Sequence, residues 1–418
     1  MSVIEPQVIS TAPPREGGVV ESDGAHLPRF SWLDSFRRIT TSGEFIPEID
    51  GLRFIAISAV VWRHVAVLIC SWLIEIGHPV SAEGLLKYGR HGVELFFVIS
   101  GFILSTPFAM HARMGTKKVN LKRYFLRRLT RLEPPYVLSM VIYFLVKIKF
   151  QSGVAHLADL FYSLFYVAGI MRGHMPWVSI VAWSLEVEVQ FYLLMPVLAM
   201  IYWISNRWAR RSLIVVLAAL FVGFGPYMIN GVTTGEPYDR TLLNYIQYFL
   251  MGLLMADVYA TEWNGAPPPL KTIRFAWGDF VWLLGWPALL GVLMLENRAM
   301  RALAPPLIFL LYISLFHSVW ARKLMRVKWI TIIGGMCYSI YLMHNLVMEG
   351  SLRLIKHHLP QHYYPAIFTL AAVSIPASLI LCGGYFRLIE RPCMRPDWPR
   401  RFKAWLTGAA PQPSRTAA

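Results

Sequence analysis

The sequence has little charge. Charged residues make up 15% of its 418 positions, against roughly a quarter in an average soluble protein. Hydrophobic residues make up 56% and aromatic residues 14%, which excludes an intrinsically disordered chain and a two-domain cytosolic enzyme. A chain of this composition is solvated mainly by lipid.

Cysteine is also scarce. The four cysteines form no CxxC pair and no zinc-type spacing, so we expect neither a disulfide framework nor a metal site. Residues 1–45 contain no continuous apolar run and are rich in Pro, Gly, Ser and Thr. They predict a disordered cytoplasmic tail and not a cleavable signal peptide, which would need an apolar stretch before its cleavage site.

Long apolar segments begin at Leu52. Ten of them are long enough, or nearly so, for the ~20 residues that a bilayer crossing requires. They predict an all-α, polytopic membrane bundle of about ten helices over residues 46–392, followed by a cytoplasmic tail at 393–418. The ten segments are 52–74, 91–110, 133–149, 182–204, 212–229, 241–259, 278–295, 306–320, 330–349 and 364–387.

The positive charges favour one orientation of this bundle. With both termini in the cytoplasm, 28 Lys and Arg residues lie on the cytoplasmic side and 10 on the other, as the positive-inside rule requires. The formal charge of +16 is then explained by the lipid bilayer as partner, and nucleic acid is not needed. An additional span at 157–171 would reverse the basic loops 206–211 and 321–328, so we interpret 157–171 as a re-entrant or interfacial element on the outer side.

Ionisable groups at membrane depth are costly and are therefore functional candidates. Arg53 and His64 are eleven residues apart, which places them on one face of a helix and ~16 Å apart along its axis. Arg53 then lies near the cytoplasmic surface and His64 near the midplane. A packed, hydrogen-bonded histidine and a snorkelling arginine are the structural alternatives.

The second span opens with two further polar groups. His91 and Glu94 share a helix face, and Gly101, after Ser100, permits close approach of another helix. Packing explains Ser100 and Gly101 as well as chemistry does.

The stretch 113–131 holds eight cations and no acid. It is either a cytoplasmic anchor to anionic lipid or a phosphate clamp, because Arg128 and Arg131, next to Arg127, form a cationic pair at a helix start before Pro134.

Two carboxylates, Glu186 and Glu188, open the fourth span and point ~200° apart around the helix. At least one must therefore face the protein interior, where it could handle protons or fix a histidine tautomer. The second intramembrane histidine, His344, is expected to be structural.

In this order the motifs resemble the acyltransferase-3 family, which includes integral-membrane O-acetylases of bacterial O-antigen and exopolysaccharide. The resemblance covers 48–392 and departs from the family pattern at Phe54, Glu94, Glu186 and Cys337. We expect the periplasmic hydrolase-like domain of larger members to be absent. The matching residues are Asp50, Arg53 and His64; Glu94, Ser100 and Gly101; Arg127, Arg128 and Arg131; Trp183, Ser184, Glu188 and Tyr192; and His344 and Glu390.

The resemblance implies a multi-pass O-acyltransferase of the bacterial cytoplasmic (inner) membrane. It would move an acyl group, usually acetyl, from acetyl-CoA as co-substrate, with no permanently bound cofactor, to a sugar hydroxyl of a surface polysaccharide, lipid-linked glycan or glycolipid. His64 would be the general base, oriented or charge-balanced by Glu188 or, less readily, Glu94. An acyl-histidine intermediate, the acceptor and the oligomeric state stay open.

On the same reading, four arginines would bind the coenzyme phosphates on the cytoplasmic side, since guanidinium groups suit phosphate oxygens. They are Arg53, Arg127, Arg128 and Arg131.

Two other classes compete with an enzyme. In a proton-coupled transporter of a glycan or lipid-linked intermediate, the intramembrane His, Arg and Glu would be relay groups. That class often shows internal pseudo-symmetry, which inspection does not find here. A structural scaffold leaves the intramembrane charges without a role.

Overall fold

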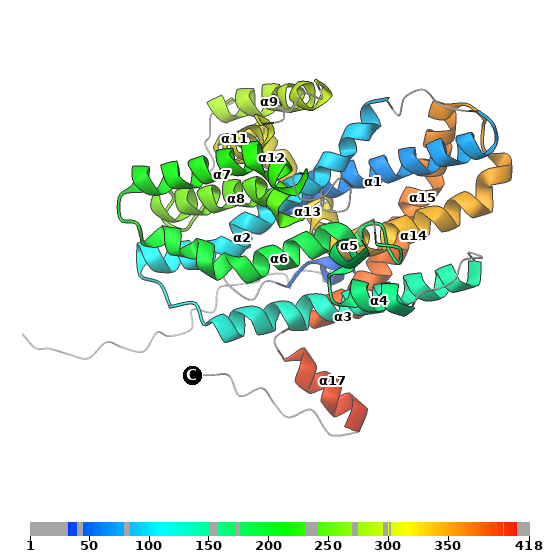
Figure 1. Cartoon of the computed structure of the whole chain (residues 1–418), viewed down its shortest axis with the longest axis horizontal. Helices are drawn as coiled ribbons and strands as arrows, with labels where there is room; N and C mark the ends of the chain where they lie inside the picture. Colours follow the sequence, from blue (N-terminus) through cyan, green and yellow to red (C-terminus); the bar gives the residue numbers. More distant parts are fainter. Residues whose placement is uncertain are drawn as a thin grey trace, which may run out of the picture.

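The computed structural model describes residues 32–39, 45–78, 84–150, 157–172, 176–230, 241–269, 275–295, 300, 302–395 and 397–407. Within these ranges the regular elements are helices (Figure 1). The long ones are α1 (Pro47–Glu75), α2 (Gly92–Met114), α3 (Leu121–Phe150), α6 (Ala182–Leu198), α7 (Arg207–Asn230), α8 (Leu242–Thr261), α9 (Trp277–Met294), α11 (Ala304–His317), α14 (Cys337–Ile355) and α15 (Tyr363–Tyr385). The short ones are η1 (Trp32–Phe36), η2 (Gly84–His91), α4 (Leu157–Leu164), α5 (Ala168–Arg172), η3 (Ala199–Trp203), α12 (Trp320–Met325), α13 (Lys328–Gly335), η5 (Lys356–His358), η6 (Phe386–Glu390), α16 (Arg391–Cys393) and α17 (Trp398–Thr407).

Helices occupy all ten of the predicted apolar segments. Six helical stretches of the described chain are long and apolar enough to cross a membrane, and a bent pair makes a seventh. The protein is therefore a multi-pass, all-helical membrane protein, whereas the number ten and the orientation stay predictions. The six are Pro47–Glu75, Leu86–Met114, Leu121–Phe150, Ala182–Trp203, Trp277–Met294 and Tyr363–Cys393.

The bent pair differs from the single straight span predicted at 330–349. The chain turns by 73° between α13 and the helix that follows it. At the end of α13 the chain approaches α1 closely, since a Cβ atom at Gly334 would lie 1.8 Å from the carbonyl oxygen of Asp50. The bend starts a new helix at Cys337, beside the first turns of α1.

Helix α3 begins twelve residues earlier than the predicted span and runs through Pro134 and Pro135. A proline has no N–H for the carbonyl four residues before it, so the carbonyl of Thr130 lacks its usual partner. The indole N–H of Trp398 in α17 donates to that oxygen at 2.7 Å. Arg127, Arg128 and Arg131 therefore lie inside the first turns of α3 and not at the start of a helix at Pro134.

The segment 157–171 forms two short helices, α4 and α5, neither long enough to cross a membrane. Tyr136 of α3 donates a 2.7 Å hydrogen bond to the carbonyl of Ser163. Gly169 donates its backbone N–H to Glu186 of α6 at 2.9 Å. These bonds hold the two short helices against α3 and α6.

Part of the predicted N-terminal tail packs against the helices. Within 32–39, Asp34 lies 3.3 Å from the ammonium of Lys328. The carbonyl of Arg37 accepts a 3.1 Å hydrogen bond from Arg391. This stretch therefore differs from the disorder predicted for 1–45.

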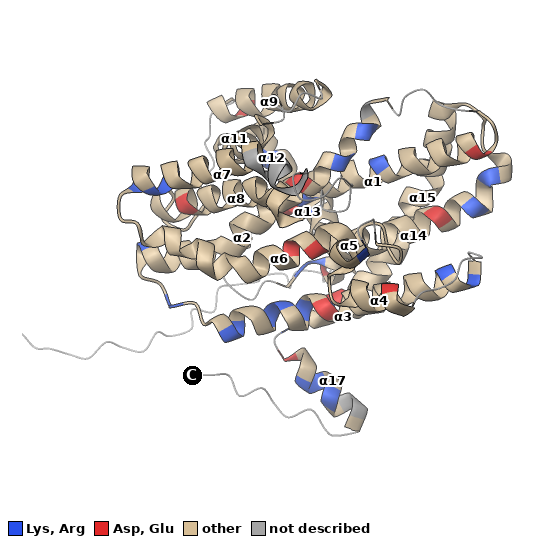
Figure 2. Ribbon diagram, viewed as in Figure 1, with Lys and Arg blue, Asp and Glu red and all other residues tan. Residues whose placement is uncertain are grey.

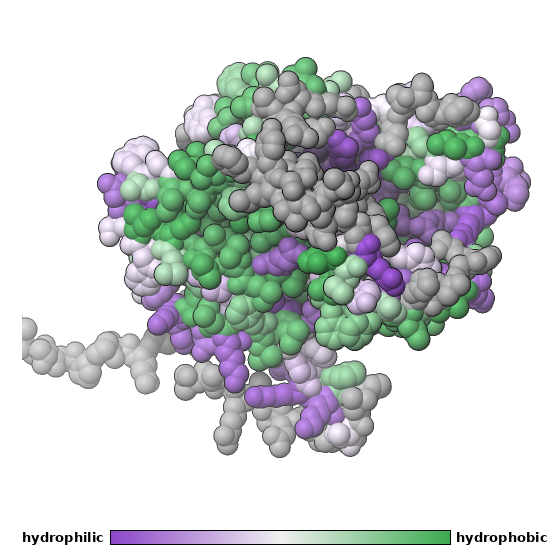
Figure 3. Space-filling model, viewed as in Figure 1, coloured by the Kyte–Doolittle hydropathy of each residue, from purple (hydrophilic) through white to green (hydrophobic). Residues whose placement is uncertain are grey.

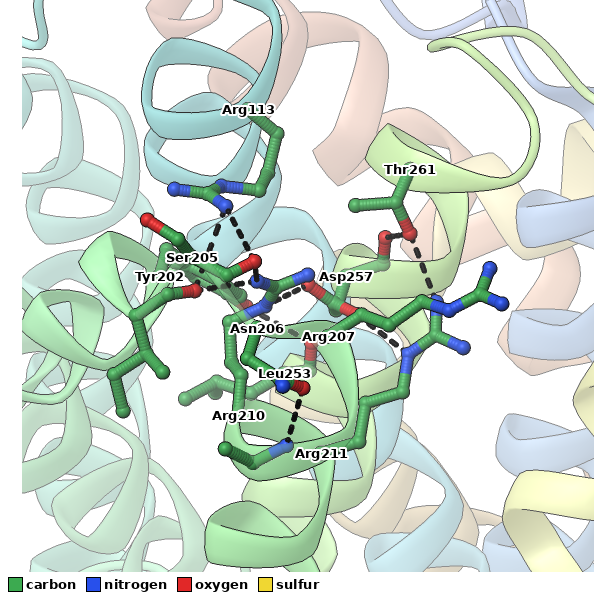
Figure 4. Close-up of polar contacts among 12 residues, drawn as sticks. Arg113, Tyr202, Ser205, Asn206, Arg207, Arg210, Arg211, Leu253, Asp257 and Thr261 are labelled. Carbon is green, nitrogen blue, oxygen red and sulfur yellow. Dashed lines mark hydrogen bonds and ion pairs between the residues drawn. The ribbon is translucent and has the colours of Figure 1, made fainter.

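Several loops predicted to be cytoplasmic meet at one end of the bundle (Figure 4). Asp257 near the end of α8 lies 2.5 Å from Arg210 and 2.7 Å from Arg211 of α7. Arg113, at the end of α2, donates to the carbonyl of Ile204 at 3.4 Å. Arg210 and Asp257 are both buried, so this ion network fixes α7 to α8.

The charges are placed as a membrane protein requires. Lys and Arg gather along the first half of α3 and at the beginning of α7, and two carboxylates of α6 lie among the helices (Figure 2). Apolar side chains cover much of the visible face, and hydrophilic ones gather toward its ends (Figure 3).

Candidate active site

Helix α1 carries both residues on which the predicted chemistry depends. It is continuous from Pro47 to Glu75, so Arg53 and His64 lie on one face, ~16 Å apart along the axis. Arg53 donates to the buried carboxylate of Asp50 at 2.6 Å. This ion pair therefore holds the guanidinium of Arg53 in place near the start of α1.

A cluster of cations surrounds Arg53. Arg38, from the segment before α1, lies 3.9 Å from Asp50 and within electrostatic reach of Arg53 and Arg131. Burial, and then the charge of Arg53, lower the pKa of Arg38 to about 9, so it stays a cation at neutral pH. Its Nε atom and that of Arg131 are buried without a hydrogen-bond partner among the described residues. We call Arg38, Arg53, Arg128 and Arg131 the arginine cluster.

Arg128 belongs to this cluster through α3. Its guanidinium lies 3.6 Å from the ring centre of Tyr124 and 5.5 Å from that of Tyr192. It is also within electrostatic reach of Arg131 and Glu188. These contacts fix the orientation of a planar cation, which suits recognition of a phosphate.

Arg127 lies elsewhere. It is half-buried, and the charge that acts on it is that of Arg123. Of the three arginines of the motif, the structure thus brings Arg128 and Arg131 together with Arg53, and leaves Arg127 on another face of α3.

Glu188 lies with the arginine cluster. Its Oε1 atom accepts a 2.5 Å hydrogen bond from Ser100 of α2. The hydroxyl of Tyr192 lies beside it, and Arg53 and Arg128 are its cationic neighbours. The partner predicted for it, His64, has a different hydrogen-bond partner.

That partner is Asn345 of α14, whose Oδ1 atom lies 3.1 Å from Nδ1 of His64. The amide nitrogen of Asn345 donates in turn to Glu349 at 2.7 Å. The ring of His344 packs edge to face with that of His64, with 4.9 Å between ring centres. A half-buried imidazole with a fixed partner on one nitrogen can act as a base on the other.

His344 is fully buried. Its Nδ1 atom faces the carbonyl oxygens of Ile340 at 2.8 Å and Tyr341 at 3.0 Å. Its Nε2 atom is buried and has no hydrogen-bond partner in the part of the chain that the structure describes. The residue therefore packs against the ring of His64 and is hydrogen-bonded to its own helix.

Glu94 pairs with His91 at 2.8 Å at the start of α2. Gly101, further along α2, makes a close crossing, because a Cβ atom there would lie 2.3 Å from the carbonyl oxygen of Phe249 in α8. Gly252 faces Val98 in the same way. These small residues let α2 and α8 pack backbone to backbone.

The remaining motif residues hold helices together. Ser184 lies 2.5 Å from the hydroxyl of Tyr341, and the ring of Trp183 packs on Tyr245 at 5.3 Å. Glu390 accepts from the backbone N–H of Ser339 at 3.0 Å. This carboxylate lies at the first turn of α14, where a negative charge interacts favourably with the positive end of the helix dipole.

Sequence reasoning missed three residues of the site. Arg38 lay in a segment predicted to be disordered, and its basic character was assigned to topology. Asn345 directly follows His344, and Glu349 follows one turn later. The i, i+4 spacing of Asn345 and Glu349 could have predicted their contact from the sequence. The contact of Asn345 with His64 of α1 could not be predicted in this way.

A pocket of ≈ 320 Å³ lies at the beginning of α1, among Pro47, Glu48, Pro268, Arg322 and Arg326. Arg322 is paired with Glu48 at 2.5 Å. The pocket is thus at the end of α1 that also carries Arg53, and not at His64.

The fold and site define a helical membrane protein with a polar interior. The arginine cluster lies near the start of α1, and the imidazole of His64 lies further along the same helix. A family model described as an acyltransferase domain matches residues 46–383. The chain therefore belongs to this family of acyltransferases, as the motifs predicted.

Curated relatives agree with this assignment. The chain is 25% identical over 397 residues to the O-acetyltransferase OatA of Staphylococcus aureus (strain NCTC 8325 / PS 47), covering 87% of this chain and 59% of the relative. It is 24% identical over 401 residues to the peptidoglycan O-acetyltransferase OatA of Listeria monocytogenes serovar 1/2a, covering 87% and 58%. The chain thus spans less than two thirds of the length of these relatives. No solved structure matches it.

Proposed function

We propose that the protein is a membrane O-acetyltransferase that takes an acetyl group from acetyl-CoA and transfers it to a hydroxyl of a cell-envelope glycan. The observation that carries the proposal is the placement of Arg53, a member of the arginine cluster, and His64 on one face of α1, ~16 Å apart along its axis. A coenzyme whose phosphates sit among cations needs its thioester some distance away, and α1 offers a base at such a distance.

The proposed reaction needs one base. The acceptor hydroxyl oxygen attacks the thioester carbonyl carbon, the C–S bond breaks, and the coenzyme leaves as thiolate. An imidazole nitrogen of His64 takes the hydroxyl proton, which then passes to the thiolate. General-base catalysis of this kind contributes ~10²–10⁴-fold in rate.

The class of acceptor that we propose is supported by the relatives, one of which is named for peptidoglycan. A hydroxyl of a cell-envelope polysaccharide or lipid-linked glycan is the corresponding acceptor here. With the basic loops in the cytoplasm, the donor would enter from the cytoplasmic side of the bacterial inner membrane and the acceptor from the outer side.

The test combines binding and transfer. Full-length protein in lipid nanodiscs should bind radiolabelled acetyl-CoA, and cells that lack the gene should lose base-labile acetate from an envelope glycan. Wild-type protein should restore the acetate. His64→Ala should bind acetyl-CoA but not restore it, whereas His358→Ala, at an exposed histidine, should do both. Absence of acetyl-CoA binding by the wild type would remove the enzyme proposal.

A further inference from the structure

His64 sits at one end of a chain of three side chains that crosses from α1 to α14. Asn345 lies between His64 and Glu349, at 3.1 Å from the first and 2.7 Å from the second. Asn345 is buried and Glu349 is half-buried. Because the last two residues lie one turn apart on α14, the helix itself sets their spacing.

The acidic end of this chain decides how the amide points. An ionised carboxylate only accepts hydrogen bonds, so the group of Asn345 that faces Glu349 must be the NH₂ group. Lys147 and Tyr143 of α3 lie within electrostatic reach of Glu349, and the amide nitrogen of Asn345 donates to its Oε1 atom at 2.7 Å. The amide oxygen is thereby left to face His64.

The amide oxygen in turn decides the state of the imidazole. An amide oxygen only accepts, so Nδ1 of His64 must carry the hydrogen of this bond. A neutral imidazole has a single N–H, so its Nε2 atom carries the lone pair.

We propose that Asn345 is a positioning residue which, held by Glu349, fixes His64 in the Nδ1-protonated tautomer and so presents Nε2 as the basic atom. The use of that atom on an acceptor hydroxyl rests on the proposed function. The tautomer stands on the hydrogen bonds alone.

The neighbours of His64 are compatible with this assignment. His344 faces two carbonyl oxygens through Nδ1, so it is also Nδ1-protonated and has no N–H to offer from Nε2. Arg63 of α1 also lies within electrostatic reach of His64, and a guanidinium accepts no hydrogen bond. Neither residue takes the place of Asn345 as the acceptor at Nδ1 of His64.

A spectroscopic test reads the tautomer without using activity. In full-length protein labelled with ¹⁵N-histidine in nanodiscs, the resonances lost in His64→Ala identify this ring, and ¹⁵N shifts distinguish a protonated from a bare ring nitrogen. We expect a protonated Nδ1 and a bare Nε2 at neutral pH. A wild-type ring protonated on Nε2 would overturn the inference.

Variants test the chain itself. Glu349→Gln replaces an acceptor by a group that also donates, so the Asn345 amide can turn over and both tautomers of His64 should appear. Asn345→Asp keeps an acceptor and should keep the tautomer, whereas Asn345→Leu should lose it. A tautomer unchanged in Asn345→Leu would show that Asn345 only packs α14 on α1.

Kinetics link the tautomer to turnover. Asn345→Leu should lower kcat about 10- to 100-fold, as removal of an outer partner of a functional imidazole does, with KM for acetyl-CoA unchanged and most of the rate regained in Asn345→Asp. Ser351→Ala is the matched control, because that hydroxyl donates to the carbonyl of Val347 in its own helix. If His64→Ala stays active while the tautomer is as expected, the proposed base is wrong and the positioning inference stands.

Discussion

The hydroxyl of Ser100 lies 2.5 Å from Oε1 of Glu188, and this hydrogen bond joins α2 to α6. It assigns Glu188 to the level of the arginine cluster, where Arg53 and Arg128 are its cationic neighbours. A carboxylate there reduces the positive charge that a coenzyme phosphate would meet. Its effect should therefore be on the donor and not on the base.

Glu188→Gln tests this. The amide oxygen can still accept from Ser100, but one negative charge near Arg53 and Arg128 is lost. Acetyl-CoA should bind about fivefold more tightly, corresponding to ~1 kcal/mol for a partly screened charge interaction, as measured by titration calorimetry. In a plot of the transfer rate against pH, the limb that rises as the catalytic base loses its proton should stay at the same pH. A displaced limb would mean that Glu188 acts on His64, as its motif suggested.

Arg128→Ala and Arg131→Ala should each weaken acetyl-CoA binding by ~1.5–3 kcal/mol, the contribution of a hydrogen bond to a charged group. The acceptor's KM should barely change. Lys122→Ala, exposed on the same helix, provides the control for general loss of charge. If both arginine variants alter only the amount of protein in the membrane, these residues are topological anchors.

The orientation of the bundle is testable at Trp208, an exposed residue near the start of α7. In a protein whose native cysteines are replaced by serine, Trp208→Cys should resist an impermeant thiol reagent added to intact cells. His358→Cys, placed by the same topology on the outer side, should react. Rapid labelling at position 208 would reverse the loops and rule out the ten-span arrangement.

Asp257→Asn should lower the free energy of unfolding by ~3–5 kcal/mol, because it leaves the buried cation of Arg210 without its anion. Thermal unfolding in nanodiscs measures the effect. Asp397→Asn removes an exposed i, i+4 pair with Arg401 and should change stability by less than ~1 kcal/mol. Equal effects of the two substitutions would show that the Asp257 network adds no stability.

Local regularities made the helical part of the fold and the shared face of Arg53 and His64 predictable. Eleven residues of helix return to the same face whatever surrounds them. The bend before Cys337 was not predictable, and it lies where Gly334 packs on the backbone of Asp50, a residue distant in the chain. A glycine pair alone is common in apolar helices.

The partners of His64 and Glu188 show the same limit. Both carboxylate and imidazole were recognisable from sequence as intramembrane polar groups. Which of them meet depends on the rotation and depth of packed helices, and Asn345 reaches His64 across 281 residues of chain. Neither the composition nor the periodicity of the sequence predicts a contact between residues so far apart in the chain.

The bond from Trp398 to the carbonyl of Thr130 has a practical consequence for anyone shortening this chain. The C-terminal residues look expendable, but α17 supplies the donor that Pro134 cannot, one residue from Arg131. A version cut at Pro392 would leave an open carbonyl in the helix that presents the arginines. Fusion partners and affinity tags should therefore be placed after Thr407. If a truncated enzyme binds its donor poorly, the first explanation to test is a disturbed α3 and not a change in catalysis.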